Sequence, residues 1–202
     1  MFFSGRIRHV IFALAFFGMA FKQDSTFFNK LVRSALAQTK IAVTYVPAYV
    51  QIKYPNGDVP SNTGVCTDLV IRAYRAVGID LQKEVHEDMI KKFKDYPKFW
   101  KLKNPDSNID HRRVPNLMTF FKHRNSELPI TKNASDYKPG DLVTWNLQNT
   151  NSASGITHIG IVVDQKSPDE KRYLVAHNIG GGNQVEDMLF SYTIIGHYRF
   201  SQ

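Results

Sequence analysis

Hydrophobic positions change their spacing once along the chain, from a helical period in the first part to a strand-like alternation after residue 137. The helical spacing predicts helices at residues 27–36, 65–77, 81–96 and 114–123. Runs of β-branched and aromatic residues between turns predict strands at 142–145, 157–164, 172–178 and 196–200. Helices that precede antiparallel strands are typical of an α+β domain. We therefore predict N-terminal helices packed on an antiparallel β-sheet.

Two of the predicted strands, 157–164 and 172–178, flank a polar segment and are expected to form an antiparallel hairpin. If Gln165 pairs with Arg172, the register places His177 opposite Gly160. His158 then shares a face of the sheet with His177, because side chains alternate along a strand. A register shifted by one residue would separate the two histidines.

The helix predicted at 65–77 carries the only cysteine of the chain, Cys66, in its first turn, and Gly78 follows as a stop signal. A single cysteine cannot form an internal disulfide. Unpaired N–H groups at a helix N-terminus favour a thiolate, so we expect a lowered pKa and a candidate nucleophile. The alternative is a small buried hydrophobic residue, because free cysteine is often buried.

The first 20 residues have the pattern of an export signal. Basic residues precede an apolar run at 10–21, which is shorter than the about 20 residues needed to cross a bilayer. We expect residues 1–20 to be a signal peptide cleaved after Ala20. A second possible cleavage site at 35–37 and an uncleaved membrane anchor are the alternatives. The remaining residues, 21–202, fit one domain with an insertion at about 81–136. The expected location is periplasmic or extracellular.

The net charge of the chain is positive, which is compatible with several kinds of anionic partner. Lys and Arg number 26 against 18 Asp and Glu, a formal net charge of +8. The basic residues are scattered, so we expect no nucleic-acid partner. The clusters at 86–88 and 110–113 lack the spacing of helical zinc sites, and we expect neither a metal nor another cofactor. We also expect a monomer.

Short motifs give the chain a recognisable order: a helix-borne cysteine, a Pro-Gly-Asp-Leu turn, a His-Ile-Gly-Ile-Val strand and a strand that ends in His-Asn. This order resembles the NlpC-type papain-like cell-wall peptidases. More narrowly, the chain is similar to a bacterial family known as domain of unknown function 1287. The motifs that carry the narrower resemblance are residues 64–68, 86–89, 108–117, 139–143, 158–162 and 177–180. The resemblance implies a papain-like (NlpC-type) α+β fold.

The wider resemblance implies a catalytic triad. Cys66 would be the nucleophile, His158 the general base and His177 the residue that orients His158. Asn178 is the alternative orienting residue, although it points to the face opposite His177. The sequence departs from the usual peptidase pattern at Val65 before the cysteine and at residues 67–68 after it. These departures affect the expected substrate more than the nucleophile.

Five further residues are candidates for substrate binding: Tyr54, Asp58, Asp68, Arg112 and Asn178. Their alternative roles are structural, as turn residues, a helix cap and an ion-pair partner. The function that the resemblance and the export signal imply is an exported cysteine peptidase or amidase acting on peptidoglycan peptides. The alternatives are a non-catalytic module that binds wall peptides and a thiol acyltransferase.

Overall fold

The computed structural model describes residues 26–202, so the expected signal peptide lies outside the described residues. Residues 26–38 form the first described helix. Three further α-helices are α2 (Cys66–Arg75), α3 (Leu81–Lys92) and α4 (Val114–His123). Single 3-10 turns lie between and after these helices, at η1 (Phe93–Asp95), η2 (Asp110–Arg112) and η3 (Ala134–Asp136). No helix within residues 26–202 is both long and apolar enough to cross a membrane.

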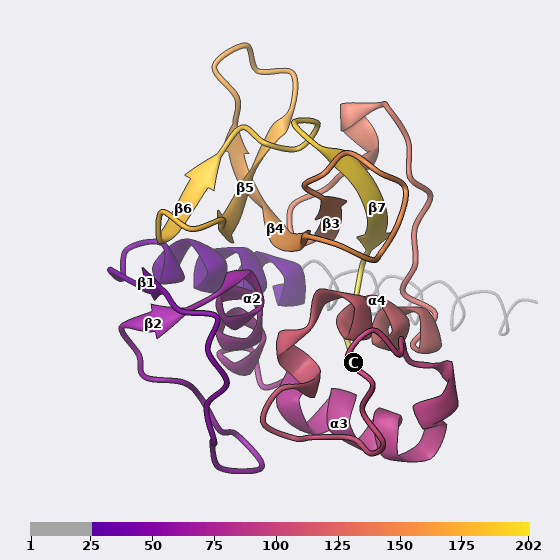
Figure 1. Cartoon of the computed structure of the whole chain (residues 1–202). Coiled ribbons are helices and arrows are strands. Elements are labelled where there is room, and N and C mark those ends of the chain that lie inside the picture. Colours follow the sequence, from indigo (N-terminus) through magenta and orange to yellow (C-terminus); the bar gives the residue numbers. More distant parts are fainter. Residues whose placement is uncertain (1–25) are drawn as a thin grey trace, which may run out of the picture.

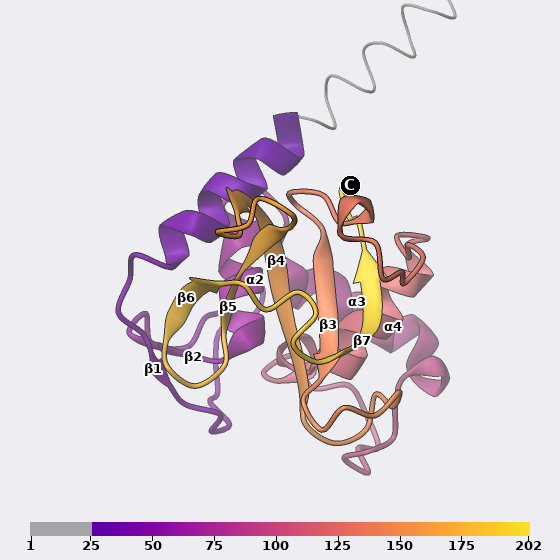
Figure 2. The same cartoon turned by 90° about the horizontal axis from the view of Figure 1, so that it is seen from above.

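Five antiparallel strands form the main sheet, in the order β6-β5-β4-β3-β7, which Figure 2 shows from above. Their bounds are β3 (Leu142–Asn146), β4 (Thr157–Lys166), β5 (Tyr173–Asn178), β6 (Asn183–Glu186) and β7 (Thr193–Tyr198). A separate pair joins β1 (Thr44–Tyr45) to β2 (Thr63–Gly64) in parallel. The predicted α+β class, with helices on an antiparallel sheet, is confirmed.

The core lies between the sheet and the helices, with α2 packed under the central strands (Figure 1). Leu69 and Val70 of α2 are buried in one cluster with Ile159 and Ile161 of β4. A smaller cluster around Trp145 covers the other face of the sheet. Both faces of β4 are therefore buried, and the strand holds the side chains that it carries in fixed positions.

The β4–β5 hairpin follows the predicted register where it matters for the histidines. Ile161 pairs with Ala176 and Val162 with Val175, the pairing that sets Gly160 opposite His177. Near the turn the prediction is wrong, because Lys166 rather than Gln165 begins the pairing, opposite Tyr173, after a bulge. Hydrogen bonds between Ser167 and Arg172 close the turn and accommodate the shift.

Other boundaries also differ from the prediction. The helix beginning at Leu81 ends at Lys92 and continues only as the 3-10 turn 93–95. Gly78 ends the α2 region as expected, with a φ of +92°, a conformation that glycine adopts without a steric penalty. Strand β6 was not predicted, because its four residues follow a glycine-rich loop and lack a clear hydrophobic alternation.

Candidate active site

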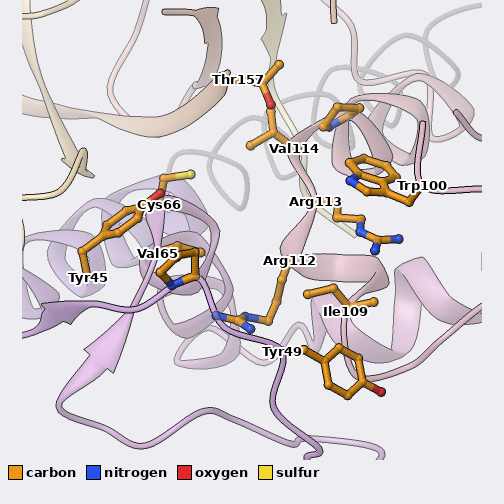
Figure 3. A pocket seen from close by; sticks show the side chains of 12 residues that line it. Tyr45, Tyr49, Val65, Cys66, Trp100, Ile109, Arg112, Arg113, Val114 and Thr157 are labelled. Atoms are coloured by element: carbon orange, nitrogen blue, oxygen red, sulfur yellow. The ribbon is translucent and has the colours of Figure 1, made fainter. Parts of the chain in front are cut away.

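A cleft of about 370 Å³ opens beside the first turn of α2. Figure 3 shows Cys66, Val65 and Tyr45 on one side of the cleft, with Trp100 and Arg113 on the other. The full lining consists of Tyr45, Pro47, Tyr49, Val65, Cys66, Trp100, Ile109, Arg112, Arg113, Val114, Pro115 and Thr157. The single thiol of the chain thus lies at the wall of a cleft that is both apolar and basic.

The environment of Cys66 keeps its sulfur protonated. Burial raises the pKa of Cys66 to about 12, and the nearby Asp68 charge adds to the rise. Hydrogen bonds from the backbone N–H groups of Ile159, Thr67 and Cys66 itself act in the opposite direction but are smaller. The expectation that the helix N-terminus makes this thiol acidic is therefore wrong, because desolvation of the thiolate outweighs the helix end.

Iodoacetamide is expected to alkylate Cys66 more slowly than free cysteine at pH 7, since only the thiolate reacts and the pKa of Cys66 is about 12. The rate should keep rising above pH 10, whereas that of a free thiol, with a pKa of about 8.5, levels off by about pH 9.5. Mass spectrometry of the single adduct measures both rates, with urea-unfolded chain as the control. Alkylation at pH 7 faster than free cysteine would show that the helix end prevails over burial.

Two buried histidines and a glutamate form a line of polar contacts at the sheet. Nε2 of His158 lies 3.0 Å from Nδ1 of His177. Nε2 of His177 lies 2.9 Å from Oε2 of Glu186, as an ion-pair contact rather than a well-aligned hydrogen bond. Nδ1 of His158 makes no hydrogen bond to any residue between 26 and 202, so this nitrogen is the one left for another partner.

Burial also sets the protonation of these histidines. It lowers the pKa of His158 to about 3, and the neighbouring His177 contributes to the decrease. The pKa of His177 is lowered by burial as well, although the charge of Glu186 and its contact with the ring oppose this effect. At neutral pH both rings are therefore uncharged. The contact with Glu186 favours a proton on Nε2 of His177, so Nδ1 of His177 can accept a hydrogen bond from Nε2 of His158.

The sulfur of Cys66 reaches β4 next to His158 but does not bond its ring. The backbone N–H of Ile159, the residue that follows His158, is near enough to the sulfur to lower its pKa. Within residues 26–202, no hydrogen bond joins the sulfur to the His158 imidazole. Thr157 lines the cleft with Cys66, whereas His158 pairs with Trp145 and so points to the face of the sheet opposite Ile159 and α2.

Glu186 is a site residue that the sequence did not indicate. In the β5–β6 ladder Val175 pairs with Glu186 and His177 with Gln184, so Glu186 is the diagonal neighbour of His177 on the same face. A predicted hairpin closing at the glycines 180–182 would have been the sequence signal for Glu186.

Gly160 has a steric role beside His177, because a Cβ there would lie 2.5 Å from Val175 Cγ1 and 3.2 Å from His177 Cβ.

Tyr45 is a second residue that the sequence did not indicate. The parallel pairing of Tyr45 with Gly64 brings it beside the turn that leads into Cys66. Burial, followed by the charges of Cys66 and Asp68, raises the pKa of Tyr45, so its hydroxyl keeps its proton and can donate at the cleft. A two-residue parallel pair has no hydrophobic period that could be recognised in a sequence.

Asp68 and Arg112 form a buried ion pair at the base of the cleft. Nε and Nη2 of Arg112 donate to the two carboxylate oxygens of Asp68 at 2.9 and 3.0 Å, and the two side chains are 2% and 3% exposed. Asp68 Oδ2 also accepts the Val65 backbone N–H at 2.7 Å, and Nη1 of Arg112 donates to Ala48 O at 3.3 Å. Arg112 lines the cleft, but its donors are directed to the protein.

The remaining predicted substrate-binding residues lie outside the lining of this cleft. Asp58 binds Arg72 at 2.9 Å and Arg75 at 3.4 Å, and Tyr54 packs its ring 5.1 Å from that of His86. Asn178 is fully buried at the end of β5, where its side-chain oxygen accepts the N–H of Gly180. His177 rather than Asn178 contacts His158. The structure therefore brings together His158 and His177, and Cys66 with Asp68 and Arg112.

The fold and the site agree with a family assignment. Residues 32–200 match the family described as domain of unknown function (DUF1287), and the chain belongs to this family. A relative, the uncharacterized protein YijF of Escherichia coli (strain K12), is 56% identical over 156 residues, which cover 77% of this chain and 73% of YijF. The predicted family resemblance is thereby confirmed.

Two solved structures share the fold at low sequence identity. Both are crystal structures of an N-acetylmuramoyl-L-alanine amidase from Bacteroides uniformis ATCC 8492, at 1.07 and 1.15 Å resolution. They match this chain with TM-scores of 0.54 and 0.53 and identities of 13% and 12%, covering 88% of this chain and 100% of the amidase chain. At such identity the likeness concerns the fold alone.

Proposed function

We propose that this protein is an exported thiol hydrolase that cleaves an amide bond in peptidoglycan peptides. The observation that supports the proposal is the placement of Cys66 in a cleft against β4, the strand that also carries His158 of the His158–His177–Glu186 line. Cys66 is the proposed nucleophile, His158 the general base, and His177 the residue that orients His158. Glu186 is a positioning residue that acts through His177.

The proposed reaction is acyl transfer through a thioester. The sulfur of Cys66 attacks the amide carbonyl carbon while the thiol proton passes to Nδ1 of His158. The C–N bond then breaks, and His158 returns the proton to the leaving amine. A water molecule attacks the thioester with its proton taken by His158, the carboxylic acid leaves, and the thiol is restored. The Cys66 backbone N–H and the Tyr45 hydroxyl are donors suited to the oxyanion.

The protonation of the resting site defines how this mechanism must work. A thiol with a pKa of about 12 and an imidazole with a pKa of about 3, on opposite faces of β4, are both neutral and form no thiolate–imidazolium pair. Proton transfer must therefore accompany the attack on the carbonyl. The line of contacts from His158 through His177 to Glu186 supports this role, since the proton that Glu186 favours on Nε2 of His177 leaves the lone pair of His158 on Nδ1.

The substrate and the location rest on the comparisons and on the N-terminal sequence. The structural neighbours are named as amidases of N-acetylmuramoyl-L-alanine, a linkage of the cell wall. The apolar run at 10–21 with preceding basic residues fits export to the compartment where peptidoglycan lies. The formal net charge of +8 suits an anionic wall polymer.

Purified sacculi are expected to release soluble muropeptides when digested with the wild-type chain and none with Cys66→Ala. Mass analysis of the products identifies the cleaved bond, and addition of an amine acceptor separates hydrolysis from acyl transfer. The substitution removes only a sulfur atom, so a folded variant is expected and its melting temperature serves as the control. Identical digests from the two proteins would remove the hydrolase proposal.

One observation favours a second function, a non-catalytic module that binds wall peptides. Within residues 26–202 no hydrogen bond joins the Cys66 sulfur to an imidazole, the His158 side chain lies on the opposite face of β4, and burial disfavours the thiolate. A binding module would bind to sacculi without releasing muropeptides from them. Cosedimentation with sacculi, measured for the wild type and for Cys66→Ala, would then give the same bound fraction for both.

A further inference from the structure

Arg113 stands out in the cleft because its guanidinium forms no ion pair with any residue between 26 and 202. The guanidinium carbon lies 4.1 Å from the ring centroid of Trp100, so the group is held against the indole face. Its Nη1 is buried without a hydrogen-bond partner. Both side chains line the cleft, and Figure 3 shows them on the wall that faces Cys66. A buried, unpaired guanidinium nitrogen is costly and marks a place that an anion can fill.

The preceding residue shows that the lack of a partner is particular to Arg113. Arg112 directs its donors to Asp68 and to the carbonyl of Ala48. Arg113 forms no ion pair with any residue between 26 and 202, although Asp106 and Asp110 are near enough to raise its pKa against the effect of burial. Asp106 accepts a hydrogen bond from Asn108 and Oδ2 of Asp110 contacts His86, whereas Oδ1 of Asp110 is buried and makes no hydrogen bond within residues 26–202.

The surroundings of Arg113 fit a planar anion attached to an organic chain. Ile109, Val114 and Pro115 contribute apolar side chains to the same cleft. Stacking on Trp100 fixes the plane of the guanidinium, which lets its N–H groups meet both oxygens of a carboxylate. A phosphate or sulfate would lose the apolar contacts, whereas a peptide carboxylate keeps them.

We propose that Arg113, held flat on Trp100, binds a free carboxylate of the substrate, so that the cleft selects an acidic peptide for attack by Cys66. This proposal rests on the proposed function for the attack but not for the binding. The carboxylate subsite and the thiol lie on opposite walls of one cleft, and the ligand must span the space between them. Peptides whose carboxylates have been amidated are therefore poor ligands.

Protection of Cys66 from alkylation tests this subsite without requiring turnover. Two soluble stem peptides serve as probes, one with free carboxylates and one with the same carboxylates converted to carboxamides. The alkylating agent is iodoacetamide at pH 9, where the thiolate fraction gives a measurable rate. For the wild type we expect the acidic peptide to protect Cys66 at a concentration at least tenfold lower than the amide.

The variants separate the charge of Arg113 from its geometry. In Arg113→Gln the acid and the amide should protect equally, within twofold. Arg113→Lys should keep part of the difference, because lysine is a point charge without the planar fork. Arg124→Gln is the matched control, since it removes the same charge from an ion pair with Glu84 outside the cleft lining. It should retain the full tenfold preference.

Three results would overturn the proposal: equal protection by both peptides in the wild type, no protection by either, or an undiminished preference in Arg113→Gln. The last would mean that Arg113 only balances Asp106 and Asp110, and a lower melting temperature would accompany it. Failure of the proposed function is distinct. Muropeptide release unaffected by Cys66→Ala would reject the hydrolase, while a carboxylate preference in the protection assay would still stand.

Discussion

Replacing His158 with alanine is expected to lower amide cleavage by roughly 10³-fold or more at pH 7, because it removes the proposed acceptor of the thiol proton. Among residues 26–202 we expect no other imidazole to replace it, since the ring of His177 already contacts Glu186. His177→Ala should cost less, about 10- to 100-fold, because it leaves the base in place but free to rotate. Muropeptide release per unit time measures both losses.

The pH profile adds a check that a merely structural role would not affect. The pKa of His158 is about 3 in the folded chain, so its neutral, base-competent form persists as the pH falls from 7 to 5. The wild-type rate should therefore change little over this range. For a histidine with an ordinary pKa of about 6.5, the neutral fraction would fall about 25-fold. His158→Ala with more than a tenth of wild-type activity would contradict the assignment of the base.

Asp68→Asn should lower the free energy of unfolding by about 3–5 kcal/mol, because it leaves the Arg112 charge buried without compensation. Both partners are nearly inaccessible, with side-chain exposures of 3% and 2%, so water cannot replace the lost carboxylate. The substitution also weakens the hydrogen bond from the Val65 N–H at the start of α2. Urea titration followed by circular dichroism measures the loss.

Glu84→Gln provides the matched control for this ion pair. Glu84 pairs with Arg124 at 2.7 Å, but the side chains are 22% and 42% exposed, so the loss should be at most about 1 kcal/mol. The double variant Asp68→Asn with Arg112→Met should recover part of the stability, since it removes the uncompensated charge. Equal losses for Asp68→Asn and Glu84→Gln would show that burial does not strengthen the dependence on this pair.

The sequence was sufficient for the elements with a clear period. The helix Val114–His123 and the strands from Leu142 and Thr157 begin where the prediction placed them, because apolar spacing and turn residues mark their starts. The two-residue strands β1 and β2 and the short edge strand β6 could not be predicted. Their pairing depends on tertiary contacts and not on a local pattern.

The residues of the candidate site were likewise predictable only in part. Alternation along β4 and β5 placed His158 and His177 on one face, which the contact between their rings confirms. Protonation could not be predicted, because a helix N-terminus is visible in a sequence but the desolvation of Cys66 is not. Glu186 and Tyr45 come from the unpredicted strands, so their places at the site depended on pairings that no motif reveals.

The Asp68–Arg112 ion pair has a consequence for the length of a ligand. Asp68 belongs to the helix that carries Cys66, and Arg112 directly precedes Arg113 in the chain. Thr67 strengthens the link by donating its hydroxyl to the Arg112 carbonyl at 3.2 Å. The two walls of the cleft are thus joined by an ion pair and a hydrogen bond, which fixes the gap between the thiol and the Arg113 guanidinium. If a peptide binds in the proposed way, one that is a residue too short or too long would reach only one of the two groups.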